Sequence, residues 1–254
     1  MQKQRLVLKV GSAVLTQDSK IAHKRLDKLV ELIVDLKEKY DVILVSSGAV
    51  AAGYTVMKLD KSIISNKQIL ASIGQPLLIQ TYSTEFAKYE EICSQVLLEA
   101  SIFNDDVRLL HAKQAIDNLL KNDIIPIVNE NDVTAVEELV FGDNDQLAAY
   151  ISYYFNSKLL VILTDIDGYY DDNPHINKKA KLLKKVSYIE PKELEAHSSA
   201  NNEFATGGIV TKLKAANFLL ENNKKMFLTS GFDLKYIRNF LLENKHTNGT
   251  LFQK

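Results

Sequence analysis

Short runs of aliphatic residues, separated by longer segments of helical periodicity, constrain the fold of this chain more than any other feature. The runs that predict strands are residues 5–10, 41–45, 92–98, 124–128, 159–163 and 225–228. The segments that predict helices are residues 23–39, 68–89, 108–121, 143–155, 207–220 and 234–242. Residues 136–141 predict a short hairpin. Strands that are apolar throughout are buried on both faces. The alternation therefore predicts an α/β fold with a mainly parallel sheet covered by helices. Pro126 fits this pattern if it lies at a strand end.

Size and charge narrow the class of protein. A length of 254 residues suits one large α/β domain or at most two small ones. The 31 basic and 32 acidic side chains leave a formal net charge of -1, which gives no overall field for nucleic acid or anionic lipid. No apolar run approaches the ~20 residues of a membrane span, and the N-terminus lacks the apolar core of a signal peptide. We expect a cytoplasmic protein that binds neither membrane nor nucleic acid.

Cys93 is the only cysteine, so no intrachain disulfide can form. It lies in an apolar run with no neighbouring feature that would activate a thiol. We expect a small buried hydrophobe rather than a nucleophile.

Sheets of this kind bind ligands beyond the carboxyl ends of their strands, so the residues that follow each strand are the candidates for a site. The first strand ends in Lys9-Val10-Gly11-Ser12. A glycine there lets backbone N–H groups approach a phosphate, and the lysine can add a positive charge. A tight turn explains the same residues equally well. Small residues at 46–53, Ser-Ser-Gly-Ala-Val-Ala-Ala-Gly, leave room either for a ligand or for close helix packing.

Polar residues directly follow another apolar strand in Asn129-Glu130-Asn131-Asp132, and they recur in Asp143-Asn144-Asp145. Polar groups in such a place are costly unless they are solvated, hydrogen-bonded or functional. Asp143 is a candidate cap for the helix that follows. The asparagine amides can bind a carboxylate or an amine, and the acidic groups can bind an ammonium or, through water, Mg²⁺.

Two further segments are candidate nucleotide contacts. Thr164-Asp165-Ile166-Asp167-Gly168 follows a strand, although an ordinary Asp-Gly turn needs no function. Residues 205–212, Ala-Thr-Gly-Gly-Ile-Val-Thr-Lys, open a helix whose N–H groups and roughly +0.5 charge suit a phosphate. Lys212 could reach the same anion. The alternative is Thr206 as an ordinary N-cap. Neither the Walker A pattern nor the Rossmann glycine pattern occurs.

Taken together, these motifs resemble the amino acid kinase family and, within it, the glutamate 5-kinases, over essentially the whole chain. The resemblance rests on residues 9–12, 46–53, 71–75, 129–132, 142–145, 163–165, 206–212 and 249–252. The Asn-Glu-Asn-Asp and Gly-Asp-Asn-Asp pair is specific to that group, whereas the lysine–glycine and Thr-Gly-Gly elements are shared with sister kinases. The resemblance implies a three-layer αβα sandwich with a mainly parallel sheet, forming one catalytic domain over residues 1–254. It also implies ATP-dependent phosphorylation of the L-glutamate side-chain carboxylate, the first step of proline synthesis.

The resemblance also implies roles for individual residues. Lys9 and Lys212 are the expected catalytic residues, in contact with ATP phosphates. The expected nucleotide contacts are Lys9, Gly11, Thr164, Asp165, Thr206, Gly207, Gly208, Ile209, Val210, Thr211 and Lys212. The expected glutamate contacts are Ser47, Asp132, Asn144 and Asp145. Mg²⁺ is the expected companion of ATP, and its protein ligands stay open.

The chain also departs from the family pattern. We expect no C-terminal PUA domain, because the sequence stops shortly after residues 249–252, and Asn173-Pro174 stands where the family often has Asp-Pro. The resemblance further implies a homodimer or homotetramer and, as a possible regulator, proline as a feedback inhibitor. Three alternatives stay open: a sister kinase acting on acetylglutamate, aspartate, carbamate or UMP, a non-catalytic amino-acid sensor, and an RNA-associated regulator.

Overall fold

The computed structural model describes residues 3–18, 20–135, 144–174, 176–195 and 208–254. Within these ranges an eight-stranded sheet has the order β5-β6-β4-β1-β7-β9-β10-β8, and β2 pairs with β3 in a small second sheet. The strands are β1 (Gln4–Val10), β2 (Thr16–Gln17), β3 (Lys20–Ile21), β4 (Tyr40–Ser46), β5 (Cys93–Leu98), β6 (Ile125–Glu130), β7 (Leu159–Thr164), β8 (Lys185–Val186), β9 (Met226–Ser230) and β10 (Thr250–Phe252). In the large sheet only β9 and β10 are antiparallel neighbours.

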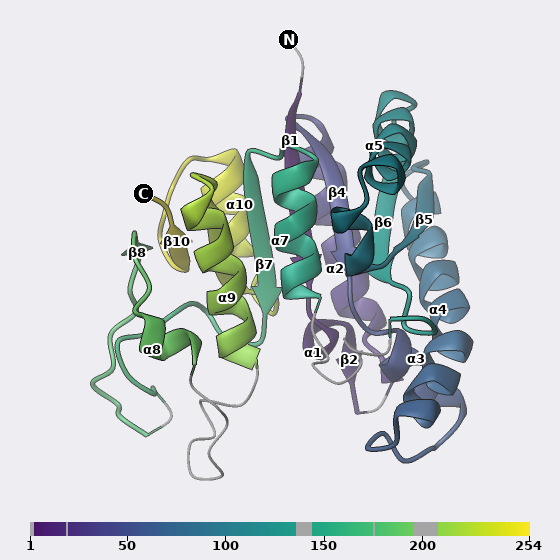
Figure 1. Ribbon diagram of the computed structural model, residues 1–254, viewed down its shortest axis with the longest axis horizontal. Coiled ribbons are helices and arrows are strands. Elements are labelled where there is room, and N and C mark those ends of the chain that lie inside the picture. Colours follow the sequence, from purple (N-terminus) through teal and green to yellow (C-terminus); the bar gives the residue numbers. More distant parts are fainter. Residues whose placement is uncertain (1–2, 19, 136–143, 175, 196–207) are drawn as a thin grey trace.

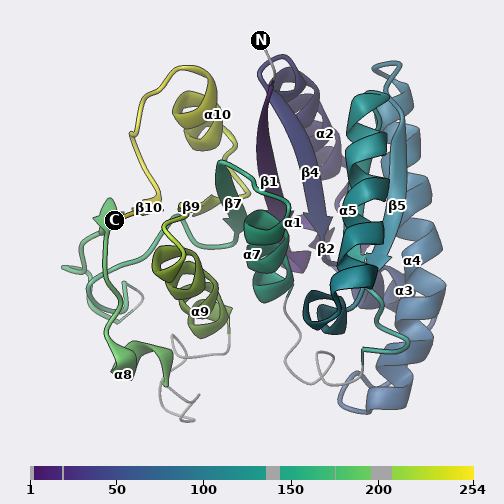
Figure 2. The same ribbon diagram turned by 45° about the horizontal axis from the view of Figure 1, so that its top comes forward.

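Helices cover both faces of the large sheet. They are α1 (Ser12–Leu15), α2 (His23–Lys37), α3 (Ala49–Val56), α4 (Ile64–Ala87), the 3₁₀ helix η1 (Ala100–Asn104), α5 (Asp106–Lys121), α7 (Asp145–Tyr154), α8 (Pro191–Leu194), α9 (Gly208–Glu221) and α10 (Lys235–Leu242). Figure 1 shows α7 and α9 in front of the sheet and α2 and α10 behind it. In the rotated view of Figure 2, α5 and α4 flank the end of the sheet that β5 and β6 form.

The core is divided by the sheet into two clusters. Leu6, Leu8 and Val10 of β1 belong to the cluster that α2 and α10 cover, whereas Val7 belongs to the cluster beneath α7 and α9. Successive side chains of a strand point to opposite faces, so an apolar strand such as β1 contributes to both clusters. This arrangement confirms the expected three-layer αβα sandwich with its mainly parallel sheet.

The predicted strands and helices are confirmed, with ends that differ by a few residues. Pro126 is the second residue of β6, and the pairing of β6 with β4 begins one residue later, at Leu44 and Ile127. Ile125 N–H faces the β5 side of β6 and donates to Ile92 C=O, so the next residue, Pro126, faces β4. The pairing with β4 has not begun at that point, so the N–H group that proline lacks is not needed there. The hairpin predicted at 136–141 lies outside the described residues. The sequence pattern did not predict α3, whose residues are mostly small.

The structure also tests the expectations about Cys93 and about membrane spans. Cys93 is half-buried against the core, and burial raises the pKa of its thiol, which does not favour a nucleophile. Across the described ranges, no helix is both long and apolar enough to cross a membrane.

Close contact between α3 and α4 explains two of the glycines. A Cβ atom on Gly74 of α4 would lie 1.8 Å from the carbonyl oxygen of Ala49, and one on Gly53 of α3 would lie 1.9 Å from that of Leu70. The two helix backbones therefore touch, as only glycine permits. The small residues at 46–53 thus serve helix packing at Gly53. Gly48, just before α3, is required for another reason, since its φ angle is 111°.

This contact predicts the effect of adding one methyl group. Gly74→Ala should lower the free energy of unfolding by about 1–3 kcal/mol, because an added Cβ forces the helix backbones apart. Chemical denaturation followed by circular dichroism measures the change. Gly208→Ala is the matched control, since its Cβ would meet no atom within 4 Å. Equal stability of the Gly74→Ala protein and the unsubstituted protein would show that the contact is not as tight as described.

Candidate active site

The carboxyl ends of the central strands are tied together by backbone hydrogen bonds. Gly11 N–H, just after β1, donates to Leu163 C=O of β7 at 3.0 Å. Ser47 N–H, just after β4, donates to Val10 C=O of β1 at 3.1 Å. The residues that leave these strands therefore start from fixed positions along one edge of the sheet, where parallel sheets bind ligands.

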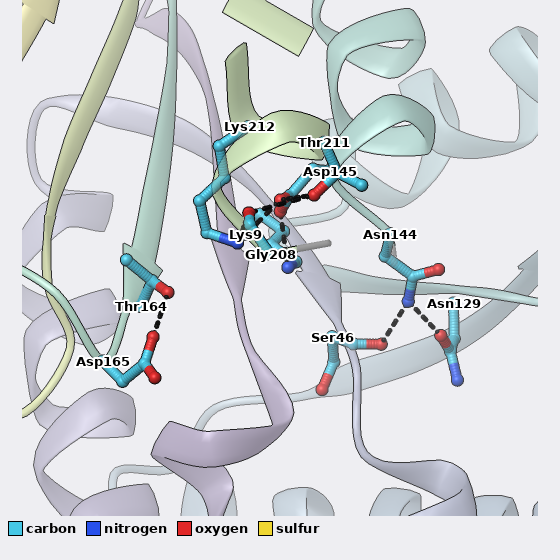
Figure 3. A network of polar contacts seen from close by, with 10 residues as sticks. All are labelled: Lys9, Ser46, Asn129, Asn144, Asp145, Thr164, Asp165, Gly208, Thr211 and Lys212. Atoms are coloured by element: carbon cyan, nitrogen blue, oxygen red, sulfur yellow. Dashed lines mark hydrogen bonds and ion pairs between the residues drawn. The ribbon is translucent and has the colours of Figure 1, made fainter. Parts of the chain in front are cut away.

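Lys9, Asp145 and Lys212 form a buried lysine–aspartate cluster at this edge (Figure 3). Lys9 Nζ lies 2.5 Å from Asp145 Oδ1, and Lys212 Nζ lies 3.0 Å from Asp145 Oδ2. The exposed fractions of the three residues are 3%, 0% and 6%. The two ammonium groups come from β1 and α9, which are far apart in the sequence, and the carboxylate stands at the start of α7. The cluster carries a net charge of +1 in surroundings from which water is largely excluded, so its field on a nearby anion is strong.

The first turn of α9 adds to this positive region. Lys212 Nζ also donates to Gly208 C=O at 2.8 Å, which brings the ammonium back to the N-terminal end of its own helix. Thr211 Oγ1 donates to Asp145 Oδ2 at 3.2 Å. A helix N-terminus carries roughly +0.5 charge, so α9 and both lysines favour a phosphate at the same place.

Asn144 directs its side chain away from the lysine–aspartate cluster. Its Nδ2 donates to Ser46 C=O at 3.2 Å and to Asn129 Oδ1 at 2.6 Å, at the ends of β4 and β6. The residue occupies the N-cap position of α7 but makes no side-chain capping hydrogen bond. An asparagine cap typically contributes ~1 kcal/mol to a helix, so its use elsewhere points to another role. Asp143, the expected cap, lies outside the described residues.

The other expected glutamate contacts lie on the same side as Asn144. Ser47 is half-buried directly after β4. Asp132 is half-buried and lines a hollow of about 230 Å³ between α4, the strand β5 and the segment that follows β6. Asp145, also expected to contact glutamate, touches both lysines.

The remaining expected nucleotide contacts surround the lysine–aspartate cluster only in part. Thr164 Oγ1 donates to Asp165 Oδ1 at 2.9 Å at the end of β7, next to β1 (Figure 3). Val210 is buried and Ile209 packs against the core, so either would meet a nucleotide through its backbone. Gly208 is exposed at the first position of α9. Thr206 and Gly207 lie outside the described residues.

Two buried polar residues of this region contact each other and Asn144, which the sequence did not predict. Asn129 is 2% exposed and holds Asn144, and Gln75 of α4 in turn accepts from Asn129 Nδ2 at 2.8 Å. Both belong to motifs that carried the family resemblance. A polar residue on the inner side of a helix or strand indicates a buried contact, but the sequence does not reveal the partner.

Tyr82 and Ser46 form a further buried pair behind β4. Ser46 Oγ donates to Ser47 C=O at 3.0 Å, so Tyr82 OH is the donor in its 2.9 Å bond to Ser46 Oγ. Burial raises the pKa of Tyr82, which keeps the phenol protonated as this bond requires. The pair stabilises the end of β4 and needs no role in the chemistry.

The lysine–aspartate cluster makes a prediction about stability. Asp145→Leu should lower the free energy of unfolding by about 3–5 kcal/mol, because it leaves two buried ammonium groups without their counter-charge. Lys9→Met and the double variant complete a double-mutant cycle, and we expect the double variant to lose less than the sum of the single losses.

The exposed pair of Asp27 and Lys88 is the control for this cycle. Its side chains are 46% and 51% exposed, and exposed pairs contribute about 0–1 kcal/mol, so Asp27→Leu should have little effect. Strictly additive losses for Asp145 and Lys9 in denaturant titrations would contradict the buried ion pair.

Comparison with known proteins agrees with this geometry. Residues 4–230 match the model of the amino acid kinase family. The chain is 52% identical over 248 residues to a glutamate 5-kinase of Leishmania donovani, which covers 98% of this chain and 94% of that protein. It is 50% identical over 253 residues to a glutamate 5-kinase of Wolinella succinogenes, covering 98% and 97%.

Solved structures with low sequence identity share the fold. A carbamate kinase from Giardia superposes with a TM-score of 0.67 at 16% identity, covering 100% of both chains. A UMP kinase from Ureaplasma parvum superposes with a TM-score of 0.64 at 20% identity, again over 100% of both chains. The family match and the similar relatives span most of the sequence that builds the sheet and the lysine–aspartate cluster. The chain therefore belongs to the amino acid kinase family and groups, within it, with the glutamate 5-kinases.

Proposed function

We propose that this protein transfers the γ-phosphoryl group of ATP to the side-chain carboxylate of L-glutamate and releases L-glutamyl 5-phosphate and ADP. The observation that supports this most is the lysine–aspartate cluster, in which Lys9 and Lys212 meet at one buried carboxylate beside the N-terminus of α9. The names of the relatives supply the acceptor, since those proteins are glutamate 5-kinases. The reaction would be the first step of proline synthesis.

The chemistry calls for charge stabilisation rather than a general base. A glutamate side chain has a pKa of about 4.3, so the attacking carboxylate is already an anion at neutral pH. Its oxygen forms a bond to the γ-phosphorus while the bond from that phosphorus to the bridging oxygen breaks, and ADP leaves with the electron pair. The obstacle is the approach of one anion to another. Lys9, Lys212 and the N–H groups of α9 would reduce the repulsion by binding the phosphoryl oxygens.

Asp145 has a different task from the one that the family resemblance implied. It is fully buried and contacts both lysines and Thr211, so we assign it to holding the two ammonium groups in place. An ammonium group has three N–H donors, so each lysine can bind Asp145 and still donate to a phosphate. Asp145 is a positioning residue in this proposal, whereas Ser47, Asp132 and Asn144 are the candidates for contact with glutamate.

Mg²⁺ would accompany ATP and neutralise part of its charge. Among the described residues no group of three His, Cys, Asp or Glu side chains could hold a metal ion. Mg²⁺ usually binds substrate phosphates with only one or two protein carboxylates and keeps several waters. Asp165, exposed at the end of β7, is the candidate among the expected nucleotide contacts. Feedback inhibition by proline and assembly into a homodimer or homotetramer stay predictions.

Glutamate-dependent ADP release is the direct test of this function. We expect turnover with ATP, Mg²⁺ and L-glutamate, and formation of the hydroxamate when hydroxylamine traps the acyl phosphate. Acetylglutamate, aspartate, carbamate and UMP serve as the comparison, and we expect little turnover with any of them. ADP release with one of these and not with glutamate would assign the chain to a sister activity. Glutamate binding without ADP release would indicate a sensor.

Removing either lysine tests the role of the cluster. Lys9→Met and Lys212→Met should each lower kcat by ~10²–10³, or roughly 3–4 kcal/mol, since a preorganised stabiliser of the transferring group is lost. Lys214→Met is the matched control, because Lys214 is exposed on the same helix. Asp132→Asn should instead raise the KM for glutamate with little change in kcat. Normal kcat in both cluster variants would rule out this role for the lysines.

A further inference from the structure

A buried chain of side-chain amides leads from Asn144 to the hollow beside α4. Asn144 Nδ2 donates to Asn129 Oδ1 at 2.6 Å, Asn129 Nδ2 donates to Gln75 Oε1 at 2.8 Å, and Gln75 Nε2 donates to Gln95 Oε1 at 3.0 Å. Asn144, Asn129 and Gln75 are at most 9% exposed, and Gln95 is exposed on β5, an edge strand of the sheet. We call these four residues the amide chain. Every bond in it runs in the same direction, away from the candidate glutamate contacts and toward β5.

Two backbone groups fix this direction. Glu130 N–H donates to Asn129 Oδ1 at 2.9 Å, and Ser46 C=O accepts from Asn144 Nδ2 at 3.2 Å. A backbone N–H can only donate and a carbonyl oxygen can only accept. Neither asparagine can therefore exchange the places of its oxygen and nitrogen without losing a bond to the backbone. The oxygen and nitrogen of a carboxamide are assigned from their partners, and here the partners leave one choice.

The fixed direction determines what Asn144 can recognise. Its two N–H groups are both used, by Ser46 C=O and by Asn129 Oδ1. Within the described ranges no hydrogen bond of the protein reaches Asn144 Oδ1. The group that Asn144 can offer to a substrate is therefore an acceptor. Free glutamate presents two carboxylates, which only accept, and one ammonium, which only donates. The ammonium is the complementary group.

Gln75 adds a side-chain constraint on Asn129 to those of the two backbone groups. Its carbonyl oxygen accepts from Nδ2 of Asn129, which is buried, so loss of Gln75 removes a hydrogen-bond partner from a buried donor. The base of the Gln75 side chain is itself held, because the neighbouring Gly74 is in contact with the Ala49 carbonyl of α3. The contact between α3 and α4 thus helps to position Gln75, Gln75 positions the carboxamide of Asn129, and Asn129 positions that of Asn144.

We propose that Gln75 is a positioning residue that makes the site selective for a substrate with an α-ammonium group. It does so without touching the substrate, by keeping Asn144 Oδ1 directed toward the substrate as an acceptor. The inference rests on the proposed function, because it takes glutamate as the acceptor of the phosphoryl group. It adds Gln75 of α4 to the residues that determine substrate specificity. It also proposes that Asn144 binds the ammonium group of glutamate rather than one of its carboxylates.

The test compares glutamate with glutarate, which has the same two carboxylates but no amine. In Gln75→Met, a hydrogen-bond acceptor is removed at nearly constant side-chain length. We expect the KM for L-glutamate to rise about tenfold, as for loss of one buried hydrogen-bond partner, with the KM for ATP unchanged. The Ki of glutarate as a competitor of glutamate should stay the same, because glutarate has no group that Asn144 Oδ1 could bind.

Gln80→Met is the matched control, with the same substitution on an exposed position of the same helix. It should leave the KM for glutamate and the Ki of glutarate unchanged. If Gln75→Met does not fold, as judged by thermal melting, Gln75→Asn replaces it. That variant stays polar but draws its carbonyl one methylene back from Asn129, and we expect the same loss of preference for glutamate.

The possible outcomes separate failure of the inference about Gln75 from failure of the proposed function. Equal weakening of glutamate and glutarate in a folded Gln75 variant would mean that Gln75 only supports the structure, and the inference would be wrong while the proposed function stands. An unchanged KM for glutamate would refute it in the same way. If the unsubstituted protein released no ADP with glutamate, the proposed function would fail first and the inference with it.

Discussion

The ion pairs of Asp145 with Lys9 and Lys212 are the interaction on which the rest of the site depends. A fully buried carboxylate is tolerated only when positive charge compensates it, and here two ammonium groups from separate elements do so. The same pairs hold β1, α7 and α9 at one point. A buried network thereby also sets the spacing of the two cations, so in the proposed site stability and phosphate binding would have one physical origin.

Two consecutive residues divide the site into its functional halves. Asp145 reaches the lysines, whereas Asn144 reaches the ends of β4 and β6 and lies next to the candidate glutamate contacts. Asn144 is the N-cap of α7 and Asp145 its first residue, so in the proposed site one peptide unit separates the phosphate contacts from the amino-acid contacts. This explains why the Gly-Asp-Asn-Asp motif contains more polar residues than a helix cap needs. It also explains why the cap itself is left without a side-chain hydrogen bond.

The layers of the fold were predictable from the sequence because buried parallel strands are apolar throughout, and β1 and β4 follow this rule closely. The edge of the sheet that holds the candidate site was also predictable, because parallel sheets bind ligands beyond the carboxyl ends of their strands. Pairings across the chain were not predictable. Nothing in the sequence indicates that Asp145 meets Lys9 and Lys212, or that Gln75 meets Asn129, since these contacts depend on how α4, α7 and α9 are placed. The helix α3 escaped prediction because its small residues show no amphipathic pattern, and the contact of Gly53 with Leu70 explains their size.

The two lysines differ in how firmly the protein holds their backbones. Lys9 lies on β1, which is hydrogen-bonded on one side to β4 and on the other to β7, so its Cα position is fixed relative to the whole sheet. Lys212 stands in the second turn of α9, whose apolar side chains pack against one face of the sheet. One cation is therefore anchored in the sheet itself, and the other is carried by a helix that covers the sheet. In the proposed site, a phosphate between them would be held by the sheet from one side and by a covering helix from the other.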